Sequence, residues 1–256
     1  MKKYIEIFKY SIKQNLAFKF NYTFTIISLA IHLFVFNELW DYILQGKTAA
    51  GFTKTQLIWY ITIAEFIVYS SIRSYNKISD MVKNGDIANI LIKPIDFIKY
   101  KFMEDISVII KTIVNVISII AIGLVLTGPI ECSVQNICFT VLASIIGVIT
   151  QILIQIFIGL MAFIMEETKG IWLIIQKLSF LLVFTPIEFY PAVVQKIFYC
   201  LPTTYMVYAP ARIFIGLDIG TTIILLLLEI VSLLLWYVGC RILYAKGVRR
   251  INVNGG

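Results

Sequence analysis

The sequence NGDIANILIKPIDFIKY, residues 84–100, is a polar stretch between two long apolar segments. Asn84 and Gly85 form a turn dipeptide because both residues tolerate a left-handed backbone. Asp86 is placed to cap a short helix through its carboxylate, and Pro94 ends that helix because the residue before a proline avoids helical angles. Three residues share one apolar face of this helix: Ile87, Ile90 and Leu91. The stretch therefore predicts a short amphipathic helix.

Basic residues surround this helix and indicate that it lies at a membrane surface. They are Lys83, Lys93, Lys99 and Lys101. A short amphipathic helix on the cytoplasmic side of a membrane protein is suited to contact a soluble partner and to be displaced by it. The whole segment 73–101 is therefore predicted to be a cytoplasmic coupling loop.

The composition around this loop is that of an integral membrane protein. The chain has 256 residues, of which 59% are hydrophobic, and its mean hydropathy is +0.88. Soluble domains average only about 45–50% apolar residues, so this chain cannot hide its apolar surface in one core. A membrane-spanning helix needs roughly 20 apolar residues, which leaves room for six spans and for no sizeable soluble domain.

The predicted fold is all-α, with six spans in a single transmembrane domain over residues 1–256. The spans are expected at residues 22–44, 57–72, 106–126, 137–165, 171–184 and 219–244. The fourth is longer than a span requires, so a tilt or a bend is expected near Gly147 or Gly159. The only histidine, His32, lies in the first span, where hydrogen bonding to a neighbouring helix is commoner than metal binding.

Two further segments are predicted to lie at the membrane surfaces. In residues 1–20 the apolar side chains recur with helical spacing and lysines occupy the other faces, which is typical of an interfacial amphipathic helix. Residues 185–218 contain four prolines among aromatic residues, so a straight span cannot form there. Two short re-entrant or interfacial helices at the outer face are expected instead.

The basic residues are divided unequally between the loops, and this division predicts the orientation. Sixteen of the Lys and Arg residues fall in segments on the side of the N-terminus, and four fall on the opposite side. Basic residues concentrate in cytoplasmic loops, so both termini are expected in the cytoplasm. The net charge of +7 therefore reports topology, and we expect no nucleic-acid partner.

Sequence motifs for catalysis are missing. There is no phosphate-binding GxxxxGK[ST] loop, no HExxH motif and no serine in a nucleophile-elbow context. The four cysteines form no CxxC pair, although a Cys132–Cys138 bridge remains open. Buried acids within spans are functional candidates by default, and Glu65 and Glu229 are two such residues. For each, pairing with a neighbouring span is an equally good interpretation.

The order of these elements resembles the permease subunit of type 2 exporters of the ATP-binding-cassette (ABC) class, especially bacterial permeases of about this length. Three stretches carry the resemblance: GDIANILIKPIDFIKY after the second span, PIEFYPAVVQKIFYCLPTTYMVYAPARIFIG before the last, and the tail RILYAKGVRRINVNGG. Each motif alone is weak, but together, in order and on this topology, they are fairly specific.

The resemblance implies a subunit without catalytic activity of its own, which pairs with a second permease chain and docks a cytoplasmic ATPase. ATP and Mg²⁺ would bind to that ATPase, so no cofactor is expected in this chain. By resemblance, the ATPase-docking residues are Gly85, Asp86, Ile87, Ile90, Leu91 and Pro94, with a smaller contact at Glu166 and Glu167. The translocation pathway or outer gate would include Glu65, Glu188, Pro191, Pro202, Tyr205 and Pro210.

Two alternatives of another class stay open: a membrane enzyme that modifies lipids without a partner, and a channel or immunity-type membrane protein. The channel or immunity-type protein would not need the amphipathic loop, and the enzyme would need clustered intramembrane acids or histidines. The cargo, and the choice between a homodimer and a pair of paralogues, are not encoded in any motif of this sequence.

Overall fold

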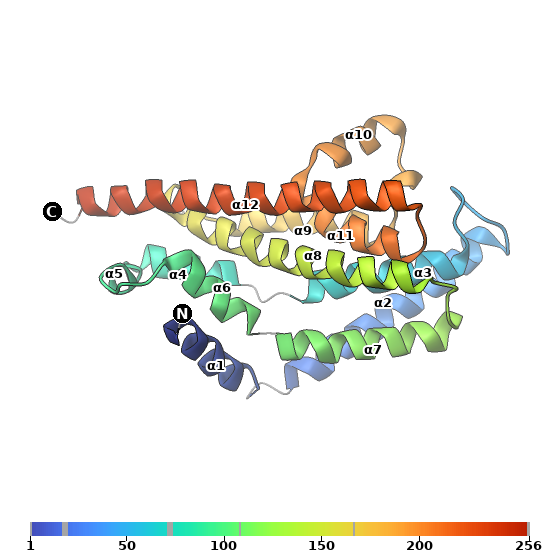
Figure 1. Ribbon diagram of the computed structural model, residues 1–256, viewed down its shortest axis with the longest axis horizontal. Helices are drawn as coiled ribbons and strands as arrows, with labels where there is room; N and C mark the ends of the chain where they lie inside the picture. The colour runs from blue at the N-terminus through green and yellow to red at the C-terminus, as the bar shows by residue number, and fades with distance from the viewer. Residues whose placement is uncertain (1, 17–19, 71–73, 108, 166, 255–256) are drawn as a thin grey trace.

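The chain folds into a bundle of helices, as seen in a computed structural model (Figure 1). The structure describes residues 2–16, 20–70, 74–107, 109–165 and 167–254. Their helices are α1 (Lys2–Leu16), α2 (Phe20–Leu44), α3 (Lys54–Tyr69), α4 (Ser74–Lys83), α5 (Ala88–Leu91), α6 (Phe97–Ile106), α7 (Ile109–Thr127), α8 (Val134–Leu160), α9 (Lys169–Phe184), α10 (Ala192–Cys200), α11 (Pro202–Phe214) and α12 (Ile219–Asn254), with short 3₁₀ turns η1 (Met161–Phe163) and η2 (Ile187–Phe189). Within these ranges the only β pairing is an isolated bridge between Ala49 and Phe52.

Helices form at all six positions where spans were predicted, namely α2, α3, α7, α8, α9 and α12. Four segments are long and apolar enough to cross a membrane; two are parts of α2 and α12, and the other two include α3 and α8. Residues 112–127 of α7 form a shorter apolar helix. The all-helical class is confirmed, and the apolar helices indicate a multi-pass membrane protein.

The core of the bundle forms around α8 and α11. Helix α8 packs against α12, α11 and α4, whereas α11 also packs against α3 and α9. Most side chains of α11 are buried, including Tyr205, Met206 and Val207. The proline-rich segment 185–218 therefore contains two short helices, as predicted, and the second of them is enclosed by protein rather than lying at a surface.

The glycines of α8 do not break the helix, which runs without interruption from Val134 to Leu160. The expectation of a bend near Gly147 or Gly159 is thus replaced by a packing role. A Cβ atom on Gly147 would lie 2.5 Å from the carbonyl oxygen of Met206 in α11. A Cβ atom on Gly159 would lie 2.5 Å from Cβ of Ile78 in α4. Both glycines allow another helix to approach the backbone of α8 closely.

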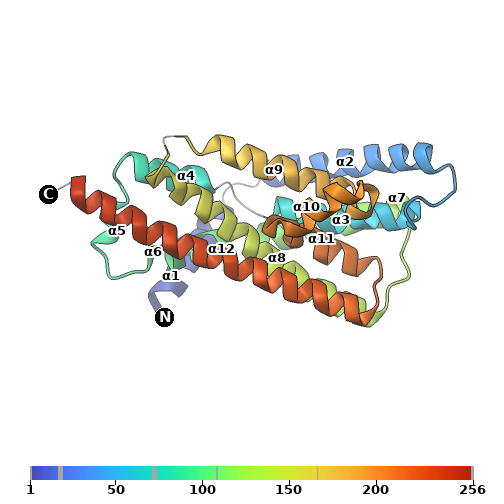
Figure 2. The same ribbon diagram turned by 90° about the horizontal axis from the view of Figure 1, so that it is seen from above.

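The segments predicted to face one side of the membrane gather at one end of the bundle. Helices α1, α4, α5 and α6 lie there together with the C-terminal end of α12, on the left in Figures 1 and 2. Helix α12 continues beyond residue 244, where its span was predicted to end, to Asn254. The loop between α2 and α3 and the turn between α11 and α12 lie at the opposite end.

Candidate functional site

The predicted turn before the coupling helix is present at the end of α4. Gly85 has a φ of +79°, a left-handed conformation that glycine adopts without strain. The amide of Asn84 donates to the carbonyl of Asp80 at 2.9 Å, and the amide of Ile87 donates to the carbonyl of Met81 at 3.0 Å. The chain therefore folds back from α4 into α5 through a hydrogen-bonded turn.

The predicted capping role of Asp86 is wrong. Helix α5 spans only Ala88–Leu91, so its N-cap position is Ile87, a residue without a side-chain acceptor. The side chain of Asp86 is exposed within the turn instead. The aspartate that does cap a helix here is Asp96, whose carboxylate accepts from the amide of Lys99 at the start of α6 at 3.0 Å.

The apolar face predicted for this helix is directed largely inward. Ile87 and Ile90 are buried in a cluster formed by α4, α6, α8 and α12. Their side chains are therefore not exposed to a partner in this structure, and their docking role stays a prediction. Leu91 is half-buried and Pro94 is exposed, while the neighbouring Ile92 is 83% exposed. Ile92 is thus the apolar side chain that this loop presents outward.

Asp96 connects the loop to two other helices, a role that the sequence analysis missed. Its carboxylate pairs with the guanidinium of Arg241 in α12, and its amide donates to the Tyr4 hydroxyl of α1 at 2.9 Å. Partial burial opposes ionisation, but the Lys99 amide and the Arg241 guanidinium outweigh it and lower the pKa of Asp96. An aspartate shortly after a proline and directly before an apolar run is a recognisable N-cap signal.

The second predicted cytoplasmic contact lies beside the coupling loop. Glu167 is exposed, and its carboxylate lies 4.0 Å from the ammonium of Lys83 at the end of α4. The Thr168 hydroxyl lies 3.3 Å from the Ser79 hydroxyl of α4. The amide of Lys169 and nearby lysine charges lower the pKa of Glu167. Glu166 lies outside the described residues, so only Glu167 is placed.

A cluster of charged side chains lies between α4 and α6. The ammonium of Lys101, which is buried, lies 2.7 Å from the carboxylate of Glu104, which also lies 3.7 Å from Lys77. Asp105 is buried beside them, and its Oδ2 has no hydrogen-bond partner among the described residues. Burial raises the pKa of Asp105 to about 7, because the Ser74 hydroxyl and the lysines compensate for desolvation only in part.

Asp105 is expected to make the stability of the protein fall as pH rises. The carboxyl of Asp105 stays protonated up to about pH 7 in the folded chain, but only up to about pH 3.8 in the unfolded chain. The free energy of unfolding therefore decreases as pH rises through this window, by at most about 4 kcal/mol. We expect the midpoint of thermal unfolding in detergent to drop by about 5 °C between pH 5 and pH 8.

Asp105→Asn should flatten this dependence, whereas Asp80→Asn, which changes an exposed aspartate of α4, should leave it in place. An unchanged slope in Asp105→Asn would show that another group is responsible.

At the opposite end of the bundle, the prolines start or interrupt helices. Pro191 is the N-cap residue of α10, Pro202 is the first residue of α11, and Pro210 lies inside α11. Because Pro210 has no amide hydrogen, it cannot donate to the carbonyl of Met206, the atom that Gly147 of α8 approaches. Each proline therefore has a clear structural role in this segment.

Glu188 ties the start of this segment to α11. Its Oε1 accepts from Arg212 Nε at 2.6 Å and from the Tyr208 hydroxyl at 3.0 Å. Arg212 also lies over the ring of Phe52, at 4.8 Å from its centroid. The nearby Tyr205 hydroxyl donates to the carbonyl of Tyr199 at 2.7 Å. The sequence predicted a gate role for Glu188 without indicating a partner. Only the fold shows that Arg212 is that partner.

The two intramembrane acids have different surroundings. Glu65 in α3 is buried, and its Oε1 lies 2.8 Å from Nδ1 of His32 in α2. This contact confirms that His32 bonds to a neighbouring helix, and it favours the pairing interpretation for Glu65. Glu229 in α12 is fully buried, and neither carboxyl oxygen has a hydrogen-bond partner within the described part of the chain. It faces the close contact between Gly147 and Met206.

These features define a helical membrane protein with a helix-rich loop at one end and a proline-interrupted helical segment at the other. A family model described as "ABC-2 family transporter protein" matches residues 19–255. The chain belongs to this family, and it is therefore a transport permease of the ABC-2 type. A search of curated proteins finds no match for the chain.

Proposed function

We propose that this chain is the membrane-spanning subunit of an ATP-driven exporter, with six spans and both termini in the cytoplasm. Membership of the ABC-2 family supports the transport role. Helices at the six predicted positions, together with sixteen basic residues on one side against four on the other, support the topology. In this arrangement the end that carries α1, α4, α5 and α6 is cytoplasmic, and α10 is external.

The docking proposal rests on one exposed isoleucine, in a loop that buried side chains hold against the bundle. Ile92 presents its side chain outward, while Ile87 and Ile90 anchor the same loop in the bundle. An apolar side chain that inserts into a pocket of a partner is typical of a binding hot spot. The docking surface that we propose consists of Gly85, Asp86, Leu91, Ile92 and Pro94, with Glu167 beside it; Ile87 and Ile90 support it from within.

The contacts of this loop provide a route from the ATPase to the bundle. Asp96 is bonded to Arg241 of α12, and α4 packs closely on α8 at Gly159. A displacement of the docking surface is therefore passed to the two longest helices of the bundle. ATP-driven closure of the partner ATPases would move these helices against those of a second permease chain, which gives alternating access.

The outer segment would serve as the gate in this mechanism. The proposed gate residues lie at or near the point where α11 enters the core. They are the carboxylate of Glu188, the phenols of Tyr205 and Tyr208 and the ring of Pro210. Opening requires this segment to move, and the Glu188–Arg212 pair would hold it in place between cycles. Glu65 would act at the α2–α3 contact through His32.

A pull-down of the tagged full-length chain in mild detergent tests the proposed function. We expect an ABC-type ATPase to co-purify in a 1:1 ratio with this chain and the eluate to hydrolyse ATP. The chain on its own should hydrolyse none. A chain that elutes without any ATPase, and that shows enzymatic or channel activity by itself, would contradict the proposal and favour a membrane protein that works alone.

A further inference from the structure

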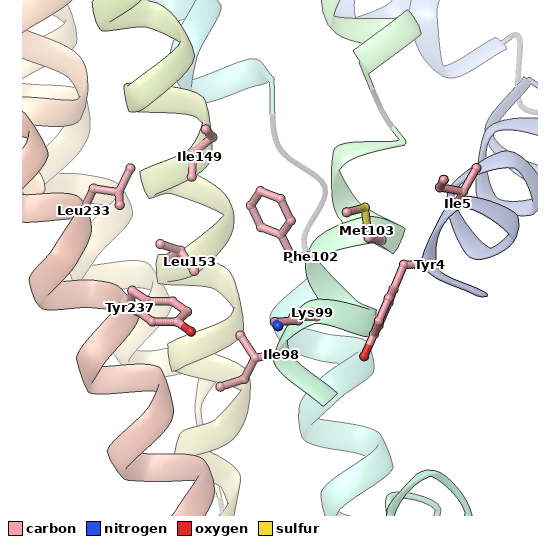
Figure 3. Close-up of a pocket in the computed structure, with 10 residues that line it drawn as sticks. All are labelled: Tyr4, Ile5, Ile98, Lys99, Phe102, Met103, Ile149, Leu153, Leu233 and Tyr237. Atoms are coloured by element: carbon pink, nitrogen blue, oxygen red, sulfur yellow. The ribbon is translucent and has the colours of Figure 1, made fainter. Parts of the chain in front are cut away.

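A cavity of about 550 Å³ lies near the proposed cytoplasmic end, and no step of the transport mechanism uses it. Its lining comes from α1, α6, α8 and α12, with α6 lying between α1 on one side and α8 with α12 on the other (Figure 3). The volume is within the range of about 300–1,000 Å³ that is usual for small-ligand sites. The residues that carry the argument are Tyr4, Lys99, Phe102, Ile149, Leu233 and Tyr237.

The cavity is lined almost entirely by apolar side chains, and its few polar groups lie towards one end. Figure 3 shows Ile149, Leu233 and Phe102 in one half, and the Lys99 ammonium with the Tyr237 hydroxyl towards the other. Along α12, Tyr237 follows Leu233 by one helical turn towards the C-terminus. The end with the polar groups therefore faces the proposed cytoplasm, and the remaining apolar lining faces the interior of the membrane. This is the polarity of a lipid in the inner leaflet.

The charges around this end of the cavity favour an anionic headgroup. The Lys99 ammonium is exposed and makes no salt bridge with any described residue. The nearby acid Asp96 is already paired with Arg241, and Glu6 of α1 lies 3.1 Å from Lys9. The Tyr4 hydroxyl accepts from the Asp96 amide, which leaves its own hydrogen available for donation. A phosphate at this position would therefore meet the Lys99 ammonium, whose charge also acts on Asp96, and the hydroxyl hydrogen of Tyr4.

We propose that the cavity binds one anionic phospholipid of the inner leaflet. One acyl chain lies against Ile149, Leu233 and Phe102, and the phosphate accepts from Lys99 and Tyr4. Basic pockets between membrane helices on the cytoplasmic side bind anionic headgroups by this combination of charge and apolar contact. The lipid contacts both α1 and α12. It thereby stabilises the position of α6, which begins at the docking loop.

This inference depends on the proposed function only for the orientation of the bundle, and its test needs no ATPase. The full-length chain, purified in detergent, is titrated with a palmitoyl-oleoyl phosphatidylglycerol or with the matching phosphatidylcholine, and bound lipid is counted by native mass spectrometry. We expect one phosphatidylglycerol per chain, bound about fivefold more tightly than phosphatidylcholine, because one lysine near an anionic headgroup contributes that much.

Two pairs of variants distinguish lipid binding in this cavity from nonspecific association of lipid with the protein. Lys99→Gln should reduce phosphatidylglycerol binding about fivefold, whereas Lys93→Gln, on an exposed lysine of the same loop that does not line the cavity, should not. Leu233→Trp fills the cavity and should weaken both lipids at least fivefold. Leu234→Trp changes the next residue, which is 52% exposed and does not line the cavity, and should have no effect.

Equal binding of the two lipids, or equal losses within either pair of variants, would overturn the proposal. All four substituted side chains are exposed or half-buried, so folded variants are expected, and size-exclusion chromatography checks this. Failure to recover an ATPase in the pull-down would leave these binding constants unaffected. The two proposals therefore fail or succeed separately.

Discussion

Replacing Gly159 with alanine is expected to destabilise the protein by about 3 kcal/mol, because there is no space for one more methyl group between α8 and α4. The new Cβ would lie 2.5 Å from Cβ of Ile78 and 3.1 Å from the carbonyl oxygen of Tyr75. Neither atom is the end of a flexible side chain, so the two helices must separate. The midpoint of thermal unfolding in detergent should fall by roughly 6–12 °C.

Two other glycines provide matched controls for this substitution. Gly170, in the first turn of α9, has no atom within 4 Å of its missing Cβ, so Gly170→Ala should be neutral or slightly stabilising. Gly123 in α7 has its nearest neighbour, the Thr62 hydroxyl, at 3.3 Å, and Gly123→Ala should have an intermediate effect. If all three alanine variants unfold at the same temperature, close packing at Gly159 is not what holds α4 in place.

The second large effect is expected at the docking surface. Ile92→Asp should weaken binding of the ATPase at least thirtyfold, because a charge would replace the apolar side chain that the loop presents, and a binding hot spot contributes about 2 kcal/mol or more. The unfolding temperature of the chain itself should be unchanged, since this side chain is 83% exposed. Co-purification of the ATPase with the tagged variant measures the first effect, and thermal unfolding measures the second.

Two control variants show whether the effect is local. Val193 in α10 is 71% exposed at the opposite end of the bundle, so Val193→Asp should retain the ATPase. Ile87→Asp, in contrast, should unfold the loop, because Ile87 is fully buried. Retention of the ATPase by Ile92→Asp would place the docking surface elsewhere. Its loss in Val193→Asp would show that charge on any exposed apolar site is enough to disrupt the complex.

The docking loop shows which features a sequence pattern can predict and which it cannot. The turn at Asn84 and Gly85 was predictable, because it depends on backbone conformations that few residue types accept. The spacing of Ile87, Ile90 and Leu91 correctly indicated an apolar face, but it did not show what the face contacts. In the fold, Ile87 and Ile90 pack on α6, α8 and α12, so Ile92 is the residue left for a partner.

The sequence by itself determined the helical membrane class, the positions of the six apolar helices and the charge bias between the two ends. These properties follow from the length and composition of continuous segments, and they need no knowledge of neighbours in space.

Only the tertiary structure decided which side chains meet. Asp96 pairs with Arg241 across 145 residues, and Glu188 pairs with Arg212 across 24 residues. Gly147 and Gly159 allow α11 and α4 to pack closely on α8, although their positions in the sequence equally suited a bend. The physical reason is that ion pairs and close packing depend on the distance between atoms of different helices, which spacing along one helix does not contain.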